Sequence, residues 1–395
     1  LNYEKDFPVI FLIFVFYYYS CQLFLLLVVN MYIVTLSKKA WIGDIEVITS
    51  QENVLKDTAS GVINLLKDYK ITEAEIELFR QSRSNFETYS SDKSVDITIL
   101  DVSILVTNPL PIDKFKDQFY GCFFGSIVGD ALGMPYEFKQ AKDIKYKPEM
   151  IAGGPFNLPE GCWTDDTSMM LCLSNSLISN KGYNNVKDQL REYLAWYRDG
   201  KNSATNTCFD IGNQTRSALE TFEKLGKIEA EFSKYSAGNG SLMRLAPIPL
   251  VFPPNFSIEN ISIISGRATH NNIMCDTTVS TMARLVSDLL VYDKSLKSNV
   301  FDKCNDPNGY VLGSAYLSVQ AVLDTDSFAS ALESIILKGG DTDTNACITG
   351  MIAGAKYGYS SIPKQWLNSL MHFDKLLLTC DKLYSLRMEK MNNAN

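Results

Sequence analysis

Apolar residues recur at helical spacing through most of the chain after residue 113. Two stretches, 186–198 and 277–290, place apolar residues three and four positions apart, which is the spacing of one helical face. Few segments in this region alternate apolar and polar residues as a strand would. We therefore predict an all-α region whose helices bury these faces against a common core.

Glycine recurs every four residues in the apolar segment YGCFFGSIVGDALG, which spans 120–133. In a helix this spacing places the glycines in one stripe, and each costs about 1 kcal/mol relative to alanine. Close contact with another helix would offset that cost. The segment GMIAGAKYG, 350–358, has the same spacing, so the two stripes predict a tight helical bundle. A membrane helix also carries such stripes, but Asp130 within the first one favours a soluble core.

The chain before residue 113 differs in character. Residues 9–29 are almost uninterruptedly apolar and long enough to cross a bilayer as a helix, and the lysines at 38 and 39 would keep the rest of the chain in the cytosol. The run lacks the features of a secretory signal. Alternatively it is not translated, because the chain begins with Leu1 and Met31 offers another start. We treat residues 1–36 as a hydrophobic segment, either a membrane anchor or an over-extended reading frame, and favour the second.

Residues 37–112 predict a small α/β unit. Helical spacing covers 54–69, a capping box at Thr72 opens a second helix to about residue 86, and residues 95–99 alternate as in a strand. The sequence NPLP at 108–111 then predicts a linker. No catalytic constellation occurs in this unit, and an interaction or localisation role is the default. Residues 113–395 form the third predicted region.

Composition narrows the classes of function. The formal net charge of −8 argues against nucleic acid as a partner, because an acidic chain repels phosphate backbones. The 9 cysteines contain no Cys-x-x-Cys pair, which argues against a zinc knuckle and against a disulfide framework. We expect free thiols in the reducing environment of the cytoplasm. With only 2 histidines, a histidine-rich metal site is excluded.

Two acidic clusters stand directly ahead of apolar helical runs. The first is WTDDT at 163–167 and the second is GGDTDT at 339–344. Both offer only oxygen donors, the ligands that Mg²⁺, Mn²⁺ and Ca²⁺ prefer. Ser, Thr and Asp ahead of a helix are also the usual N-cap residues, so either cluster alone fits a capping role better, and it is the occurrence of two such clusters that favours a metal site. The residues by themselves leave a carboxylate-bound metal site and a pair of caps as open alternatives.

Five motifs in order resemble the ADP-ribosylglycohydrolases, most closely the dinitrogenase reductase-activating branch. They are GDALGMPYE at 129–137, WTDDT at 163–167, GNGSLMR at 238–244, ATHN at 268–271 and GGDTDT at 339–344. The resemblance covers about residues 115–366. It implies a compact all-α bundle with a dinuclear Mg²⁺ or Mn²⁺ site at one end, preceded here by the small α/β unit. By motif, the implied metal ligands are Thr164, Asp165, Asp166, Asp341, Asp343 and Thr344.

The resemblance also implies an activity. Such an enzyme cleaves the glycosidic bond between ADP-ribose and a protein side chain, with arginine favoured by the branch resembled. Glu137 and Asp210 match acids of the catalytic cleft and would relay protons, while the metals activate water and hold the ribose hydroxyls. Further residues are assigned to substrate binding: Asn213, Gly238, Asn239, Gly240, Ser241, Met243 and His270.

The glycine-rich turn at 238–241 invites a more specific hypothesis. We expect its backbone N–H groups to cradle the diphosphate of ADP-ribose at a helix N-terminus. The implied partners are ADP-ribose and an ADP-ribosylated protein. The alternatives are a module that binds ADP-ribose without cutting it, a hydrolase of serine-linked, polymeric or O-acetylated ADP-ribose, and a structural relative without activity. Intact acidic motifs count against the first and the last.

Overall fold

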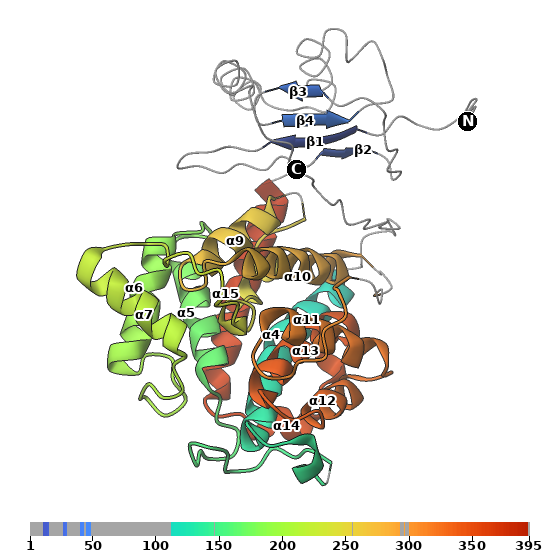
Figure 1. The fold of residues 1–395 in the computed structure, drawn as a ribbon. Coiled ribbons are helices and arrows are strands. Elements are labelled where there is room, and N and C mark those ends of the chain that lie inside the picture. The colour runs from blue at the N-terminus through green and yellow to red at the C-terminus, as the bar shows by residue number, and fades with distance from the viewer. Residues whose placement is uncertain are drawn as a thin grey trace. The chain divides into compact units, whose positions relative to one another are not determined.

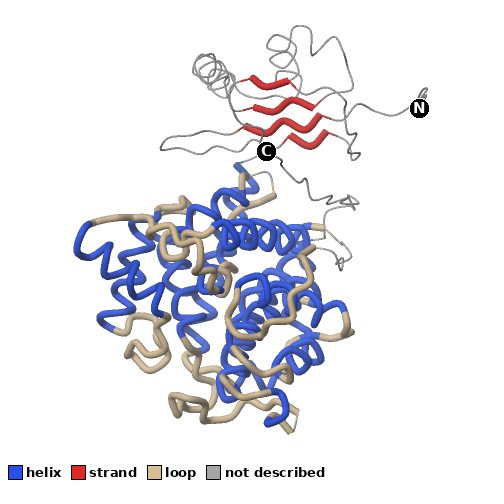
Figure 2. The backbone as a smooth tube through the Cα atoms, viewed as in Figure 1, coloured by secondary structure: helices blue, strands red, loops and turns tan. Residues whose placement is uncertain are grey.

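The computed structural model describes residues 11–15, 27–29, 40–42, 45–48, 112–145, 147–254, 256–292, 296 and 300–393. The chain separates into two compact units, Leu1–Leu105 and Val106–Asn395. Figures 1 and 2 trace the elements of both.

The described part of the second unit is built from helices joined by loops (Figure 2). Apart from short 3-10 turns, the helices are α4 (Ile112–Gly133), α5 (Asp165–Ser179), α6 (Val186–Asp199), α7 (Asn213–Leu225), α8 (Pro247–Val251), α9 (Ile258–Arg267), α10 (Ile273–Val291), α11 (Val311–Leu323), α12 (Phe328–Ile336), α13 (Thr342–Tyr357), α14 (Lys364–Ser369) and α15 (Phe373–Asn393). The predicted all-α fold class is confirmed for this unit.

Helices α4 and α13 lie side by side at the centre of the unit, with the other helices around them (Figure 1). A Cβ added at Gly129 would come within 2.0 Å of the Ala346 carbonyl oxygen, and one at Gly125 within 2.2 Å of the Gly350 carbonyl oxygen. The two backbones therefore touch, and no side chain larger than hydrogen fits between them. This contact is the one that the two glycine stripes predicted.

The remaining helices bury their apolar faces against one continuous core. The stretches 186–198 and 277–290 correspond to α6 and α10, so both predicted helices are confirmed. Helix α6 is capped at its N-terminus by Asn185, whose side chain accepts from the N–H of Asp188, and at its C-terminus by Gly200, which has a left-handed φ of 69°. The cysteines among the described residues are free thiols, most of them buried.

The described residues of the first unit form a four-stranded antiparallel sheet in the order β2-β1-β4-β3. Its strands are β1 (Phe11–Val15), β2 (Leu27–Val29), β3 (Ala40–Ile42) and β4 (Ile45–Ile48). Leu12 lies opposite Val28 on one side and Ile48 on the other. The sheet thus joins strands from both sides of the predicted boundary at residue 36.

The strands correct the expectation of one membrane-spanning helix across residues 9–29. Phe11–Val15 and Leu27–Val29 are extended, and their content of β-branched and aromatic residues suits strands. Within the described ranges, no helix combines the length and apolar character that crossing a bilayer requires. The predicted helices at 54–69 and 72–86 and the predicted strand at 95–99 lie outside the described residues.

Candidate active site

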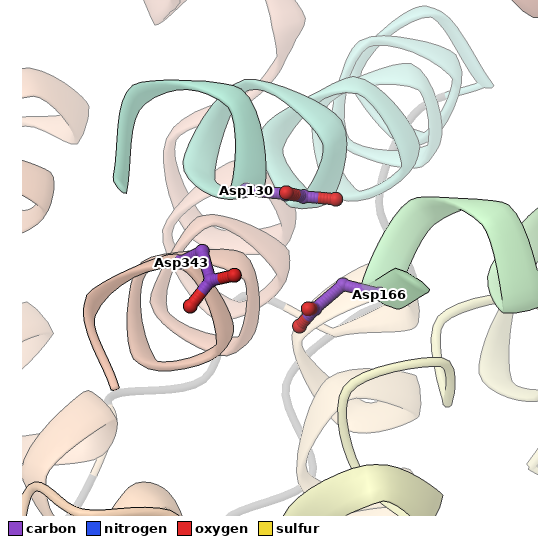
Figure 3. A group of neighbouring side chains, drawn as sticks. All are labelled: Asp130, Asp166 and Asp343. Carbon is purple, nitrogen blue, oxygen red and sulfur yellow. The ribbon is translucent and has the colours of Figure 1, made fainter. Parts of the chain in front are cut away.

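Three helices bring their carboxylates to one point. Asp130 comes from the last turn and a half of α4, Asp166 from the first turn of α5 and Asp343 from the first turn of α13. Figure 3 shows the three side chains around a shared space, and one oxygen of each lies within 4.8 Å of the others. The glycine contact between α4 and α13 therefore sets the spacing of two of these acids.

Neither acidic cluster works as a helix cap. Thr164 occupies the N-cap position of α5 and Asp341 that of α13, yet neither side chain makes a capping hydrogen bond. The Thr164 hydroxyl instead lies 2.9 Å from Asp130 Oδ1 and 3.0 Å from Asp166 Oδ2. The capping alternative therefore does not account for these clusters, and their oxygens face the shared space between the helices.

Asp130, which belongs to α4, caps the N-terminus of α5. It accepts the backbone N–H of Thr164 at 3.0 Å and that of Thr167 at 3.0 Å, in addition to the Thr164 hydroxyl. Asp130 is fully buried. Burial raises its pKa to about 6, while these hydrogen bonds act in the opposite direction. The side chain ties α4 to the start of α5 and so fixes where Thr164 and Asp166 lie.

The cluster suits a divalent cation. Asp166 Oδ1, Asp343 Oδ1 and Glu137 Oε2 are buried oxygens without a hydrogen-bond partner, an arrangement that is costly unless a cation or proton sits there. Burial and the neighbouring carboxylates raise the pKa values of Asp166 and Asp343 well above the ordinary range. A second group of acids, Glu137, Asp210 and Asp343, also brings one oxygen each within 4.8 Å. The acidic cluster could therefore hold metal ions, with Asp343 common to both groups.

A cavity of about 280 Å³ opens next to these acids. Its lining includes twelve of the residues assigned to the site from the sequence: Glu137, Asp165, Asp210, Asn213, Gly238, Asn239, Gly240, Met243, His270, Asp341, Asp343 and Thr344. Three others, Thr164, Asp166 and Ser241, are buried and do not line it. Thr344 nevertheless reaches the buried group, because its hydroxyl lies 3.3 Å from Asp166 Oδ2.

Glu137 and Asp210 are cavity acids whose pKa values are raised towards or above neutrality. Burial, and then the charges of Asp210, Asp341 and Asp130, raise the pKa of Glu137 to about 9. Burial, and then the charges of Asp341 and Asp130, raise the pKa of Asp210 to about 7. Asp210 also has a left-handed backbone, with φ of 56°, which is uncommon for a residue other than glycine. Both acids can therefore exchange protons near neutral pH.

The turn at 238–241 differs from the expected diphosphate cradle. It is a 3-10 turn, Asn239–Ser241, and the Asn239 N–H already donates to the Gly309 carbonyl oxygen at 3.1 Å. The Asn239 side chain points to the acids instead, because its Nδ2 donates to Asp341 Oδ2 at 2.8 Å and to Ser314 Oγ at 3.0 Å. The expectation that the N–H groups of the whole turn serve a ligand is therefore wrong for Asn239, whose contacts hold Asp341 in place.

His270 is neutral and packs against the same turn. A Cβ at Gly240 would come within 2.6 Å of the His270 ring, so only glycine lets the imidazole approach. The Thr269 hydroxyl lies 2.8 Å from Nδ1. Burial, and then the positive charge of Arg244, lower the pKa of His270 to about 3. The ring therefore offers the cavity a hydrogen-bonding edge without a charge.

Comparison with known proteins decides the family. The sequence model of the family described as ADP-ribosylglycohydrolase matches residues 111–305 and 275–393. The chain belongs to the ADP-ribosylglycohydrolase family. This confirms the resemblance carried by the five motifs, and the matched ranges begin at the start of α4, after the first unit.

Relatives of this glycohydrolase include proteins named for activity on arginine and on a nitrogenase component. The chain is 32% identical over 309 residues to "ADP-ribosylarginine hydrolase Tri1" of Serratia proteamaculans (strain 568), covering 71% of this chain and 82% of that one. It is 32% identical over 279 residues to "ADP-ribosyl-[dinitrogen reductase] glycohydrolase" of Rhodospirillum rubrum, covering 64% and 90%. A solved chain titled "ADP-ribosylglycohydrolase-related protein complex" superposes with a TM-score of 0.61 at 29% identity, covering 70% of this chain and all of that one.

Several residues of this glycohydrolase site were not assigned from its sequence. In the sequence Asp130 indicates only a soluble helix, although a lone carboxylate within an otherwise apolar helix also signals a buried, partnered acid. Phe138, Gln214 and Thr215 also line the cavity. Nothing in their spacing distinguishes Gln214 and Thr215 from ordinary residues of a first helical turn, whereas Phe138 directly follows the assigned Glu137.

Proposed function

We propose that this glycohydrolase removes ADP-ribose from arginine side chains of proteins by hydrolysis of the N-glycosidic bond. The proposal rests on two groups of acids that share Asp343 beside the cavity. Buried carboxylate oxygens in these groups have no hydrogen-bond partner. The name of the Serratia relative supports arginine as the linked residue. ADP-ribosylated protein and ADP-ribose are the proposed partners.

We propose further that the acids hold two Mg²⁺ or Mn²⁺ ions, through Thr164, Asp165, Asp166, Asp341, Asp343 and Thr344. All of their donors are oxygen, which suits these hard ions. Asp166 and Asp343 bring carboxylate oxygens within 4.8 Å of each other, which supports cation binding between them, and the count of two follows the family resemblance. When bound, the ions would supply positive charge for the ribose hydroxyls and lower the pKa of water.

The chain's own side chains account for the remaining requirements of the reaction. Departure of the guanidinium from the ribose passes through an oxocarbenium-like state, which needs negative charge nearby and a proton acceptor for water. Asp210, with its pKa near 7, serves as that acceptor. Glu137, with its higher pKa, holds a proton that it can give to the leaving nitrogen. Neutral His270 and the turn at Gly238 and Gly240 line the cavity. They can therefore contact ADP-ribose without placing a further charge beside its diphosphate.

The test is release of ADP-ribose from arginine-ADP-ribosylated protein by the full chain, with Mg²⁺, with Mn²⁺ and after chelation. The double variant Asp341→Asn/Asp343→Asn serves as the metal-site control. We expect metal-dependent release that the double variant lacks while its circular dichroism stays helical. Tight binding of ADP-ribose without release from arginine- or serine-linked protein would instead identify a binding module.

A further inference from the structure

Phe138 combines two unfavourable features at the edge of the cavity. Its side chain is 67% exposed although it is a large apolar group, and its backbone has a left-handed φ of 60°. It lines the cavity, and its chain neighbour Glu137 is only 7% exposed. The residue is therefore positioned where the buried acids meet solvent.

The left-handed turn does not need a phenylalanine side chain. A left-handed backbone is adopted most easily by glycine or asparagine, and a bulky residue there is strained. An exposed phenylalanine also forgoes the gain of burying its ring. Glycine or asparagine would make the same turn without either cost, so the ring itself calls for an explanation in terms of function.

Backbone hydrogen bonds hold Phe138 at the acidic end of the cavity. Its N–H donates to the Gly340 carbonyl oxygen at 2.8 Å, and the Gly340 N–H donates to the Lys139 carbonyl oxygen at 2.9 Å. Gln140 and Gly339 form an isolated antiparallel bridge just beyond. The segment after Glu137 is thus paired with the residues directly before Asp341, and this pairing fixes the backbone of Phe138 at the edge of the cavity.

We propose that Phe138 is a specificity-determining residue that stacks on the guanidinium of the ADP-ribosylated arginine. This inference rests on the proposed function. The bond to be cleaved must lie at the acidic end of the cavity, and the part of the substrate that leads from there to solvent is the modified protein side chain. A planar, weakly hydrated guanidinium stacks well on an aromatic face. A serine side chain has no such planar cation, so the ring favours arginine linkages.

Three full-length variants distinguish the effect of the Phe138 ring from the effect of the left-handed backbone. Phe138→Tyr keeps the aromatic face, Phe138→Leu keeps an apolar group, and Phe138→Asn keeps the left-handed preference without a ring. Tyr183→Leu is the matched control, because Tyr183 is 73% exposed and does not line the cavity. For each we would measure kcat/KM on arginine-linked protein, affinity for free ADP-ribose, and melting temperature.

We expect kcat/KM on arginine-linked protein to fall about tenfold in Phe138→Leu and Phe138→Asn and to stay within about twofold in Phe138→Tyr. Affinity for free ADP-ribose should stay within about twofold in all of them, since the ring contacts the leaving group. An equal loss of ADP-ribose affinity would place the ring on ADP-ribose and overturn the proposal, as would unchanged kcat/KM in folded Phe138→Leu. Failure of the proposed function would appear separately, as absence of release by the unmodified chain.

Discussion

The Nδ2 atom of Asn239 donates to Oδ2 of Asp341 at 2.8 Å, across 102 residues of sequence. Its second hydrogen bond, to Ser314 Oγ at 3.0 Å, fixes the orientation of the amide. Groups that orient metal-binding carboxylates in this way usually contribute to metal affinity as well as to the geometry of the site. Asn239 is therefore best understood as a residue that positions Asp341.

Replacement of this amide should weaken metal binding. We expect Asn239→Ala to lower Mn²⁺ affinity about tenfold, because Asp341 loses the group that orients it. Free Mn²⁺ measured by electron paramagnetic resonance during a titration without substrate reports this directly. Gln214→Ala is the control, since Gln214 lines the same cavity but bonds the Ser236 hydroxyl. Equal Mn²⁺ affinity in wild type and Asn239→Ala would contradict the assignment.

Loss of the Asp130 carboxylate should destabilise the second unit. Asp130→Ala leaves the buried N–H groups of Thr164 and Thr167 without their acceptor, which costs about 1–3 kcal/mol for each such group. Urea unfolding followed by circular dichroism gives the free energy of unfolding. Asp113→Ala, on an exposed position of the same helix, should change that free energy by less than about 0.5 kcal/mol. Similar values for the two variants would show that Asp130 does not tie α4 to α5.

A methyl group on the central stripe should separate α4 from α13. Gly129→Ala places Cβ within 2.0 Å of the Ala346 carbonyl oxygen, an overpacking that costs about 1–3 kcal/mol or more despite the better helix propensity of alanine. Gly212→Ala is the control for unfolding free energy, because nothing lies within 4 Å of a Cβ there. A Gly129→Ala protein as stable as wild type would mean that the helices are not in backbone contact.

Binding of Mn²⁺ should reverse the direction in which the free energy of unfolding changes with pH. Without metal, folded Glu137 and Asp210 keep protons up to pH about 9 and about 7, whereas the unfolded chain releases them near 4.5 and 3.8. The folded state then binds more protons, so the free energy of unfolding falls as pH rises from 7 to 9. With Mn²⁺ the stability conferred by binding should rise over the same range, because the ligands must be deprotonated. Urea midpoints at pH 7, 8 and 9, with chelator and with Mn²⁺, measure both slopes, and parallel slopes would show that Mn²⁺ does not bind beside these two acids.

The sequence predicted those parts of the site that depend on local pattern. The glycine spacing predicted that two helices meet, and the clusters around Asp166 and Asp343 predicted acids at two helix starts. Asp130 and Asn239 were assigned incompletely because their partners lie 34 and 102 residues away, at distances that spacing along the chain does not encode. The two interpretations of the apolar run at 9–29, a membrane helix and an over-extended reading frame, did not include strands, because an apolar run without periodicity does not distinguish a strand from a helix.

The pairing of α4 with α13 also constrains how this protein is made. The hydrogen bond from Thr342 Oγ1 to the Gly133 carbonyl oxygen joins residues 209 positions apart, and Asp130 and Asp343 on the same two helices are separated by a similar length of chain. A ribosome must therefore synthesise nearly the whole second unit before its first helix meets the partner that completes the acid cluster. Any nascent or truncated chain that ends before residue 342 lacks Asp343 altogether, so metal cannot assist folding until synthesis is almost complete.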